Sequence, residues 1–380
     1  MDTDRQAWPR RVMLLTSSLT VGGAEAVIAS LARHFDRSRF EVTVGHLKER
    51  GTIGDQLADE GHDVVEIPRI ATTPGKYFSF RSLHRVVRER RIELLHTHTT
   101  YSLTDAALCR LASLGDVKLV HTFHFGNYPH LPPRYLWMER VLSRAADHLV
   151  SVGVEQMGTL KRLYGIADSR ITPVLNGVNP SEPRVDGEWA ARIAADGRTV
   201  IGTTATFIEQ KGLMTLLDVA ALLKTRGVPA LFVIVGDGVL RPRLEAQIAA
   251  LGVEGTVLLA GWKADAAATM TPLYDILLQP SLWEAMSVVV LEAMAAARPV
   301  VATDVGDNRH VVIDGETGWL VAPRDVATMA DRLSALVADP EQRRRLGAAG
   351  QRRYQHHYTA EAMARAYEVL FTRVLTAPIA

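Results

Sequence analysis

The sequence predicts an α/β fold with two doubly wound halves, each a mainly parallel sheet with helices on both faces. Three observations lead to this prediction. Short apolar runs alternate with helical segments along nearly the whole chain, as they do in parallel sheets. A polar, turn-rich stretch interrupts the alternation near the middle of the chain. The length of 380 residues is enough for two domains of ordinary size.

The composition indicates a globular protein and does not favour nucleic-acid binding. A hydrophobic content of 47% with 22% charged residues is typical of a folded globular chain. The net charge of +1 is too small to indicate a nucleic-acid-binding protein. Cys109 is the single cysteine, so no disulfide forms within the chain. Acidic residues stand early and the first apolar run is short, so we expect no signal peptide, no membrane span and a cytoplasmic protein.

The first half opens with an apolar run at residues 12–17, followed by Gly22, Gly23 and a helical stretch at 24–34. A glycine pair between a strand and a helix lets the backbone approach a ligand closely, and the helix start favours an anion. A tight turn without a ligand is the alternative. Further strands are expected at residues 41–47, 64–67, 94–97, 119–123 and 148–152.

Histidines stand at the ends of two of these strands. His96 and His98 end one, and His121 and His124 end the next. Ligands of parallel sheets lie at the carboxyl ends of the strands. A metal site is the tempting interpretation, but no paired Cys or Asp set accompanies the histidines. We therefore favour contacts to a substrate.

Two features of the first half suggest a membrane contact. Residues 123–133 form an aromatic, proline-rich loop, and five arginines crowd one predicted helix: Arg81, Arg85, Arg88, Arg90 and Arg91. Together they could dock this half on an anionic bilayer. A solvated helix face and a loop that merely covers the site are the alternative.

The linker is predicted at residues 174–180, followed by a polar and irregular stretch at 180–197. We place the domain boundary there, which makes residues 1–178 the first domain and 179–358 the second. A helical segment, 359–380, completes the chain. Strands of the second half are expected at residues 200–204, 231–235, 257–259, 276–279, 300–303 and 319–321.

Residues 279–299 carry the features on which the functional prediction depends. A buried strand ends at Pro280, a loop carries Glu284, and a helix runs from about Ser287 to Arg298. The unpaired N–H groups and partial positive charge of a helix start can hold a phosphate. Glu292, on the second turn, could accept hydrogen bonds from ribose hydroxyls. Two ordinary surface carboxylates are the alternative.

The run from Glu284 to Glu292 resembles the Glu-x7-Glu motif of the retaining glycosyltransferase family 4. Other pieces match in the same order, namely Gly22-Gly23-Ala24-Glu25, Phe123-His124, Asn176-Gly177-Val178-Asn179, Lys211-Gly212, Val235-Gly236-Asp237-Gly238 and residues 315–321. The resemblance extends from about residue 12 to residue 369. It implies the GT-B fold, with two Rossmann-like domains facing a central cleft. The first domain would bind the acceptor and the second the nucleotide sugar, and the last helix would cross back to the first domain.

The resemblance also implies roles for single residues. The expected catalytic residues are His124 beside the transferred sugar, Lys211 at the donor diphosphate, and Glu284. The expected donor-binding residues are Gly22, Gly23, Gly236, Trp262, Lys263, Ser287, Val288, Val289 and Glu292. The expected acceptor residues are His98 and Asn127. Thr206 departs from the family pattern, because relatives usually place an arginine there, and Arg309 is a candidate substitute.

The implied activity is transfer of a sugar from a nucleotide-diphosphate donor, UDP- or GDP-linked, to a hydroxyl with retention of configuration and without a metal cofactor. The acceptor would be a glycan, a lipid-linked sugar or a small molecule. The expected setting is cell-surface polysaccharide or glycolipid assembly on the cytoplasmic side, with peripheral membrane contact through the first domain. A nucleotide-sugar epimerase of the same fold and a non-catalytic relative remain as alternatives.

Overall fold

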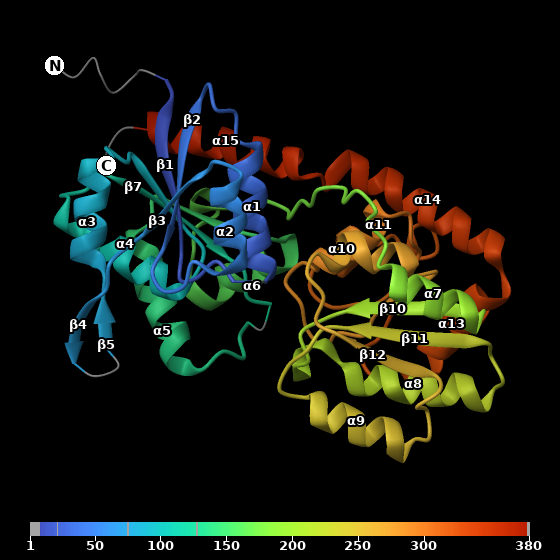
Figure 1. Cartoon of the computed structure of the whole chain (residues 1–380). Helices are drawn as coiled ribbons and strands as arrows, with labels where there is room; N and C mark the ends of the chain where they lie inside the picture. The colour runs from blue at the N-terminus through green and yellow to red at the C-terminus, as the bar shows by residue number, and fades with distance from the viewer. Residues whose placement is uncertain (1–7, 21, 74–75, 127, 378–380) are drawn as a thin grey trace. The chain divides into compact units, whose positions relative to one another are not determined.

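The computed structural model describes residues 8–20, 22–73, 76–126 and 128–377. The chain forms two compact units; in Figure 1 unit 1 is blue to green with the red helix at the end of the chain, and unit 2 runs from green to red. Unit 1 comprises Met1–Gly177 with Ala360–Ala380, and unit 2 comprises Val178–Thr359. Each unit is built around a parallel sheet, which confirms the predicted fold class.

Unit 1 contains a seven-stranded parallel sheet in the order β3-β2-β1-β6-β7-β8-β9. Its strands are β1 (Arg10–Thr16), β2 (Phe40–His46), β3 (Asp63–Glu66), β6 (Leu94–Thr97), β7 (Lys118–Phe123), β8 (His148–Ser151) and β9 (Ile171–Pro173). The hairpin of β4 (Ile70–Thr73) and β5 (Lys76–Phe78) is separate. The strand order reverses between β1 and β6, and loops leaving two such strands diverge to opposite faces.

Helices cover both faces of this sheet. They are α1 (Gly23–His34), α2 (Gly51–Asp59), α3 (Phe80–Glu89), α4 (Thr100–Ala112), α5 (Pro133–Leu142), α6 (Val154–Tyr164) and α15 (Ala360–Thr376). Apolar side chains of α1 and α15 pack on one face, and those of α3, α4 and α6 pack on the other. Figure 1 shows α15, in red, lying beside β1 and β2, far from them in the sequence.

Unit 2 contains a six-stranded parallel sheet in the order β12-β11-β10-β13-β14-β15. Its strands are β10 (Thr199–Thr204), β11 (Ala230–Val235), β12 (Val257–Gly261), β13 (Ile276–Gln279), β14 (Val300–Thr303) and β15 (Gly318–Val321). Its helices are α7 (Gly187–Asp196), α8 (Leu213–Thr225), α9 (Arg241–Ala250), α10 (Ala266–Thr269), α11 (Val288–Ala295), α12 (Asn308–Val311), α13 (Val326–Ala338) and α14 (Pro340–His357). The strand order reverses between β10 and β13. In Figure 1, α8 and α9 lie below the sheet and α10 and α11 above it.

Three local predictions were wrong. No strand was predicted at residues 171–173, but they form the edge strand β9, paired with β8. Residues 187–196, expected to be irregular, form α7, because Asp186 caps its start by accepting from the Trp189 N–H and Gly197 ends it in a left-handed conformation. The helix after Glu284 ends at Ala295 rather than near Arg298, and Ala297 follows with a φ of 55°.

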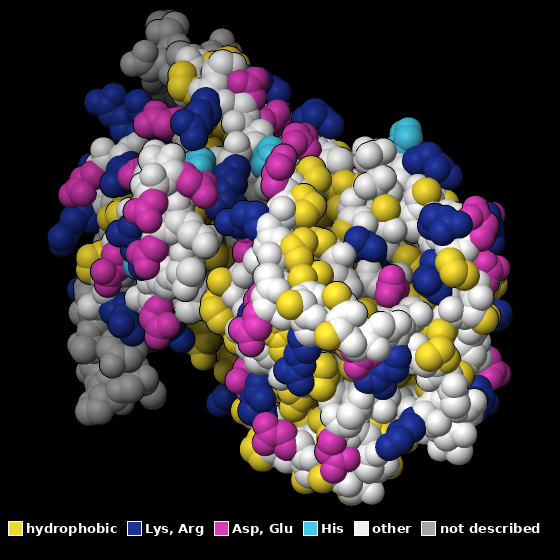
Figure 2. Space-filling view, turned by 45° about the vertical axis from the view of Figure 1, so that its right-hand side comes forward, with side chains coloured by type: hydrophobic (Ala, Val, Ile, Leu, Met, Phe, Trp, Pro, Cys, Tyr) yellow, Lys and Arg dark blue, Asp and Glu magenta, His cyan; other side chains and the backbone are white. Residues whose placement is uncertain are grey.

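The surface carries both signs of charge. On the face drawn in Figure 2, Lys and Arg side chains are interspersed with Asp and Glu, in line with the net charge of +1. No helix in the described part of the chain is both long and apolar enough to span a bilayer.

Helix α14 packs against the end of α11 through a glycine. A Cβ on Gly347 would lie 2.1 Å from the carbonyl oxygen of Ala297, just beyond α11. Gly350, one turn later in α14, has more room, since its nearest contact would be the Thr317 carbonyl at 3.4 Å. The close approach at Gly347 therefore helps to hold α11 in place.

We predict that Gly347→Ala lowers the free energy of unfolding by about 1–3 kcal/mol, because the added methyl group meets backbone atoms that cannot move cheaply. Gly350→Ala is the matched control and should be neutral or up to about 1 kcal/mol stabilising, since alanine favours a helix. Denaturant unfolding of both variants provides the measurement. Equal effects of the two substitutions would contradict the tight approach at Gly347.

Candidate functional site

The loops that follow β10 and β13 meet in unit 2. They leave the sheet where its strand order reverses, the place at which open α/β sheets bind ligands. Gly212, in the first loop, has a φ of 62°, and a Cβ there would lie 2.0 Å from the carbonyl oxygen of Pro280 in the second. A glycine is therefore needed for the two loops to touch.

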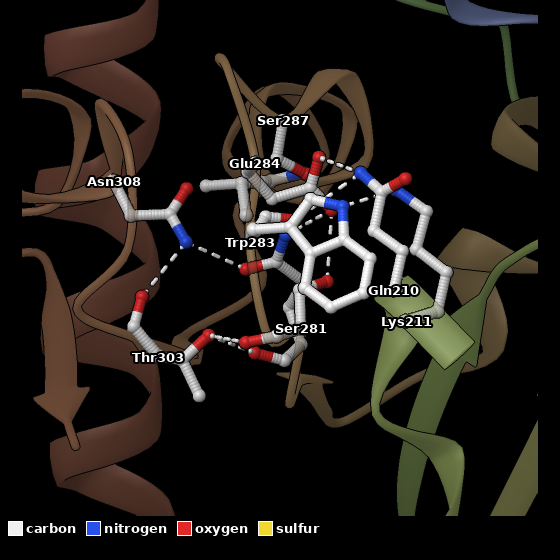
Figure 3. A network of polar contacts seen from close by, with 10 residues as sticks. Gln210, Lys211, Ser281, Trp283, Glu284, Ser287, Thr303 and Asn308 are labelled. Carbon is white, nitrogen blue, oxygen red and sulfur yellow. Dashed lines mark hydrogen bonds and ion pairs between the residues drawn. The ribbon is translucent and has the colours of Figure 1, made fainter. Parts of the chain in front are cut away.

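Glu284 is the centre of the polar network in Figure 3. Its side chain is only 7% exposed, and its Oε1 lies 2.6 Å from the Lys211 ammonium. The Ser281 hydroxyl and the Gln279 amide also donate to Oε1, at 2.8 and 3.2 Å, and the Gln210 amide donates to Oε2 at 3.4 Å. The structure thus brings the predicted residues Lys211 and Glu284 into direct contact.

A second layer holds this network in place. The Asn308 amide donates to Gln279 Oε1 at 2.7 Å and to the Thr303 carbonyl at 2.8 Å. The Thr303 hydroxyl donates to the Ser281 carbonyl at 2.6 Å. The sequence analysis missed these supporting residues. Polar side chains at the carboxyl ends of β13 and β14 were the available signal.

The start of α11 lies directly after Glu284. Ser287 is its N-cap, and the Ser287 hydroxyl accepts a long hydrogen bond of 3.5 Å from the Val290 N–H. Among the described residues, the N–H groups of Val288 and Val289 donate no hydrogen bond outside the helix, as expected for a first turn. These N–H groups could hold an anion beside Lys211.

Glu292 lies one turn further along α11. Its side chain makes no hydrogen bond or ion pair within the described part of the chain. Burial, with a smaller contribution from the Asp265 carboxylate, raises the pKa of Glu292 to about 7. A half-buried carboxyl group whose side chain has no protein partner is suited to accept hydrogen bonds from a ligand.

The remaining expected donor residues of unit 2 follow β11 and β12. A Cβ on Gly236 would lie 1.9 Å from the Ala205 carbonyl, so loop packing alone explains this glycine. Trp262 is 52% exposed. The Lys263 ammonium lies 2.8 Å from the Asp186 carboxylate. Arg309, the candidate substitute for the arginine replaced by Thr206, forms an exposed ion pair with Asp304 at 3.0 Å.

The histidines of unit 1 also gather where the strand order of their sheet reverses. His98, after β6, and His124, after β7, share a hydrogen bond of 2.9 Å between Nδ1 and Nε2. The hydroxyl groups of Ser17 and Thr99 lie 2.7 Å apart and join the loop after β1 to the loop after β6. The expected acceptor residue Asn127 lies outside the described residues.

All four histidines are neutral at neutral pH. Burial lowers the pKa of His124 to about 4 and that of His121 to about 3, and it lowers the pKa values of His96 and His98 well below their usual range. Within the described ranges, no group of three or more His, Cys, Asp or Glu side chains is arranged to hold a metal ion. The neutral pair of His98 and His124 can instead donate and accept hydrogen bonds.

The glycine pair at the start of α1 is less open than expected. Gly22 is the N-cap with an extended backbone, a conformation that any residue adopts. A Cβ on Gly22 would meet the Glu25 carboxylate at 2.3 Å. Glu25 lies in the first turn of α1 and itself complements the positive end of the helix. An anion at this helix start would have to displace that carboxylate.

The chain matches two family models, one for each unit. The model "Glycosyltransferase Family 4" matches residues 21–182, and "Glycosyl transferases group 1" matches residues 188–353. A D-inositol 3-phosphate glycosyltransferase from Xylanimonas cellulosilytica is 32% identical over 308 residues, which is 72% of this chain and 71% of the relative. An alpha-D-kanosaminyltransferase from Streptomyces kanamyceticus is 35% identical over 160 residues, 42% of each chain.

Solved structures share the fold at lower identity. HepE from Anabaena, crystallised with UDP and glucose, superposes with a TM-score of 0.84 at 19% identity, over 96% of this chain and 99% of HepE. A glycosyltransferase from Rickettsia africae gives a TM-score of 0.78 at 17% identity, over 98% of this chain and 100% of that one. These likenesses confirm the two-domain GT-B fold.

The titration of Glu292 predicts a change of stability with pH. The folded-state pKa of about 7 exceeds the ordinary value of 4.5, so between these values the folded protein holds the proton more tightly than the unfolded chain. The stability contributed by the neutral carboxyl is complete below 4.5 and is lost as the pH rises through 7.

Relative to Glu292→Gln, which stays neutral, the free energy of unfolding of the wild type should therefore fall between about pH 5 and pH 8. Denaturant unfolding of both proteins across this range checks the prediction. A difference that is constant with pH would contradict the raised pKa of the Glu292 carboxyl.

Proposed function

The chain belongs to glycosyltransferase family 4, and from that premise we propose that it transfers a sugar from a nucleoside-diphosphate donor to a hydroxyl acceptor with retention of anomeric configuration. The observation that carries the proposal is the grouping in unit 2 of a Lys211–Glu284 ion pair, a helix start with free N–H groups, and the unpartnered Glu292. The Lys211 ammonium and the helix start match the diphosphate of such a donor. Glu284 matches the transferred sugar, and Glu292 matches the ribose.

Each group has a defined part in this proposal. The Val288 and Val289 N–H groups and the Lys211 ammonium bind the diphosphate and stabilise the charge that develops as it leaves. Glu292 accepts hydrogen bonds from the ribose hydroxyls. Electrostatic stabilisation by these fixed groups needs no metal ion, so we propose a metal-independent reaction.

Glu284 acts by holding groups in place rather than as a nucleophile. Its Oε1 already accepts from Lys211, Ser281 and Gln279, and hydrogen bonds from three donors reduce the nucleophilicity of that oxygen. The Oε2 atom has only the long bond from Gln210 and can accept from a hydroxyl of the transferred sugar. With no protein nucleophile, retention requires attack on the face that the diphosphate leaves, with the diphosphate taking the acceptor proton.

The acceptor side of the reaction is assigned to the histidine pair of unit 1. His124, with His98 behind it, can position a sugar or acceptor hydroxyl as a neutral hydrogen-bonding group. One relative is named for D-inositol 3-phosphate, and another from Escherichia coli, 24% identical, for an acceptor on diphosphoundecaprenol. We propose a glycan or lipid-linked acceptor in cell-surface assembly.

A surface on α5 supports peripheral contact with the inner face of a membrane. Trp137 is 66% exposed on this helix, and Val141, one turn later, is 40% exposed. Arg134, Arg140 and Arg144 are exposed around these two residues, whereas Glu139, the single acid of the segment, is buried. An apolar strip edged by arginines suits an anionic bilayer. The α3 arginines Arg81, Arg85 and Arg88 are exposed as well.

The donor site is tested with a panel of UDP-, GDP- and ADP-sugars in thermal-shift experiments, because a ligand that binds only the folded state raises the melting temperature. We expect one nucleotide to stabilise the wild type. Lys211→Met and Glu292→Gln should each weaken its binding at least about tenfold, since each removes a charge-assisted hydrogen bond.

Lys224→Met and Glu254→Gln, which change exposed residues of unit 2 away from this network, are the matched controls and should bind as the wild type does. The stabilising donor is then assayed for nucleotide release. Release that depends on an added acceptor supports transfer, whereas epimerisation without an acceptor supports the alternative enzyme. No binding by any donor would refute the site.

The membrane surface is tested by co-sedimentation with vesicles. Wild-type protein should bind phosphatidylglycerol vesicles and not phosphatidylcholine vesicles. Trp137→Ala combined with Arg140→Glu should weaken binding at least about tenfold, since each basic residue near an anionic surface contributes about 1 kcal/mol. Val369→Ala combined with Arg365→Glu, on the exposed side of α15, is the control. Equal binding by both double variants would rule out the α5 surface.

A further inference from the structure

A buried carboxylate lies behind the histidine pair and carries no ion pair within the described part of the chain. Glu139, on the inner side of α5, is 2% exposed. It accepts three hydrogen bonds, all from hydroxyl groups. Thr100 donates to Oε1 at 2.6 Å, and Tyr128 and Tyr164 donate to Oε2 at 2.6 and 2.8 Å.

The three hydroxyl groups come from three different parts of unit 1. Thr100 begins α4, two residues after His98. Tyr128 lies in the loop after β7, four residues beyond His124. Tyr164 ends α6 and is near neither histidine in the sequence. One carboxylate therefore ties the segment after His98 to the segment after His124.

Packing supports the same connection. The rings of Phe123, Tyr128 and Tyr164 lie 6.1 to 6.2 Å apart in pairs, and Phe123 directly precedes His124. Burial, and then the nearby Glu139 carboxylate, raise the pKa values of Tyr128 and Tyr164, so both remain neutral donors. A second tether, from the Gln156 amide to the Phe125 carbonyl at 2.7 Å, holds only the start of the loop.

The histidine hydrogen bond needs this support. His98 and His124 are both neutral, so a single proton joins Nδ1 of one to Nε2 of the other over 2.9 Å. Such a bond weakens steeply when either ring moves or turns. The two rings stand on separate loops, and neither loop is part of a strand or helix at the histidine itself.

We propose that Glu139 is a positioning residue that aligns His98 with His124 by holding the Thr100 and Tyr128 hydroxyl groups on one carboxylate. The proposal rests on the proposed function in so far as the histidine pair acts on the acceptor or transferred sugar. Glu139 itself touches neither histidine and acts through the two segments that it joins.

The test compares substitutions that remove one hydroxyl each from the same carboxylate. Tyr128→Phe and Thr100→Val release the two histidine segments, whereas Tyr164→Phe removes only the hydroxyl contact of the last residue of α6, leaves the Gln156 tether in place and is the matched control. Thr100→Ser keeps the hydroxyl group. Melting temperatures establish that all four variants fold.

Histidine ¹⁵N–¹H correlation spectra, which report tautomers, are recorded for the full chain. We expect the His98 and His124 signals to shift or broaden in Tyr128→Phe and Thr100→Val, and to match the wild type in Tyr164→Phe and Thr100→Ser. Signals unchanged in all variants, or disturbed equally by Tyr164→Phe, would overturn the proposal. This readout needs no substrate, so it separates the proposal from a failure of the proposed function.

Kinetics give a second readout once donor and acceptor are known. Tyr128→Phe and Thr100→Val should lower kcat about tenfold or more, since small misplacements of catalytic groups have effects of this size. The KM for the donor should not change, because the donor groups lie in unit 2. Tyr164→Phe should retain kcat within about twofold. A loss of kcat of the same size in Tyr128→Phe and Tyr164→Phe would contradict a positioning role.

Discussion

The contact between Lys211 and Glu284 is the interaction on which the proposed donor site depends. It joins the loops after β10 and β13, which leave the sheet in opposite directions, and the backbone contact at Gly212 brings these loops close enough for the two side chains to meet. A carboxylate this buried is tolerated because Ser281, Gln279 and Gln210 donate hydrogen bonds to it in addition to Lys211. The network therefore presents the ammonium in one defined position.

The two units place polar side chains at the same point of a parallel sheet, but the residue types differ. In each, functional side chains lie where the strand order of a parallel sheet reverses. Unit 2 places a cation and a helix start there, suited to a diphosphate. Unit 1 places two neutral histidines there, suited to hydroxyl groups, with an uncharged set of donors around Glu139 behind them. In both units the side chains proposed to face a ligand are held in place by a second layer of buried polar residues.

Much of the fold was predictable because it depends on local pattern. Strands such as β6, β13 and β14 were predicted to the residue or nearly so, since short apolar runs bounded by polar residues mark buried parallel strands. One error concerned α7, where the polar composition predicted an irregular segment but the Asp186 cap stabilises a helix. Another concerned β9, an edge strand of three residues that is too short to show a pattern. Glu284, Lys211 and Glu292 were singled out from a family motif and its spacing.

The sequence by itself determined the fold class, the division into two sheets and the residue types at the strand ends, because apolar periodicity and turn residues act over short distances along the chain. Only the tertiary structure decided which polar groups meet. Lys211 forms an ion pair with Glu284, 73 positions away in the sequence, and Arg309 forms one with Asp304. The Glu139 carboxylate accepts hydrogen bonds from Thr100, Tyr128 and Tyr164. Such contacts join segments far apart in the chain, and packing of the whole domain sets their distances.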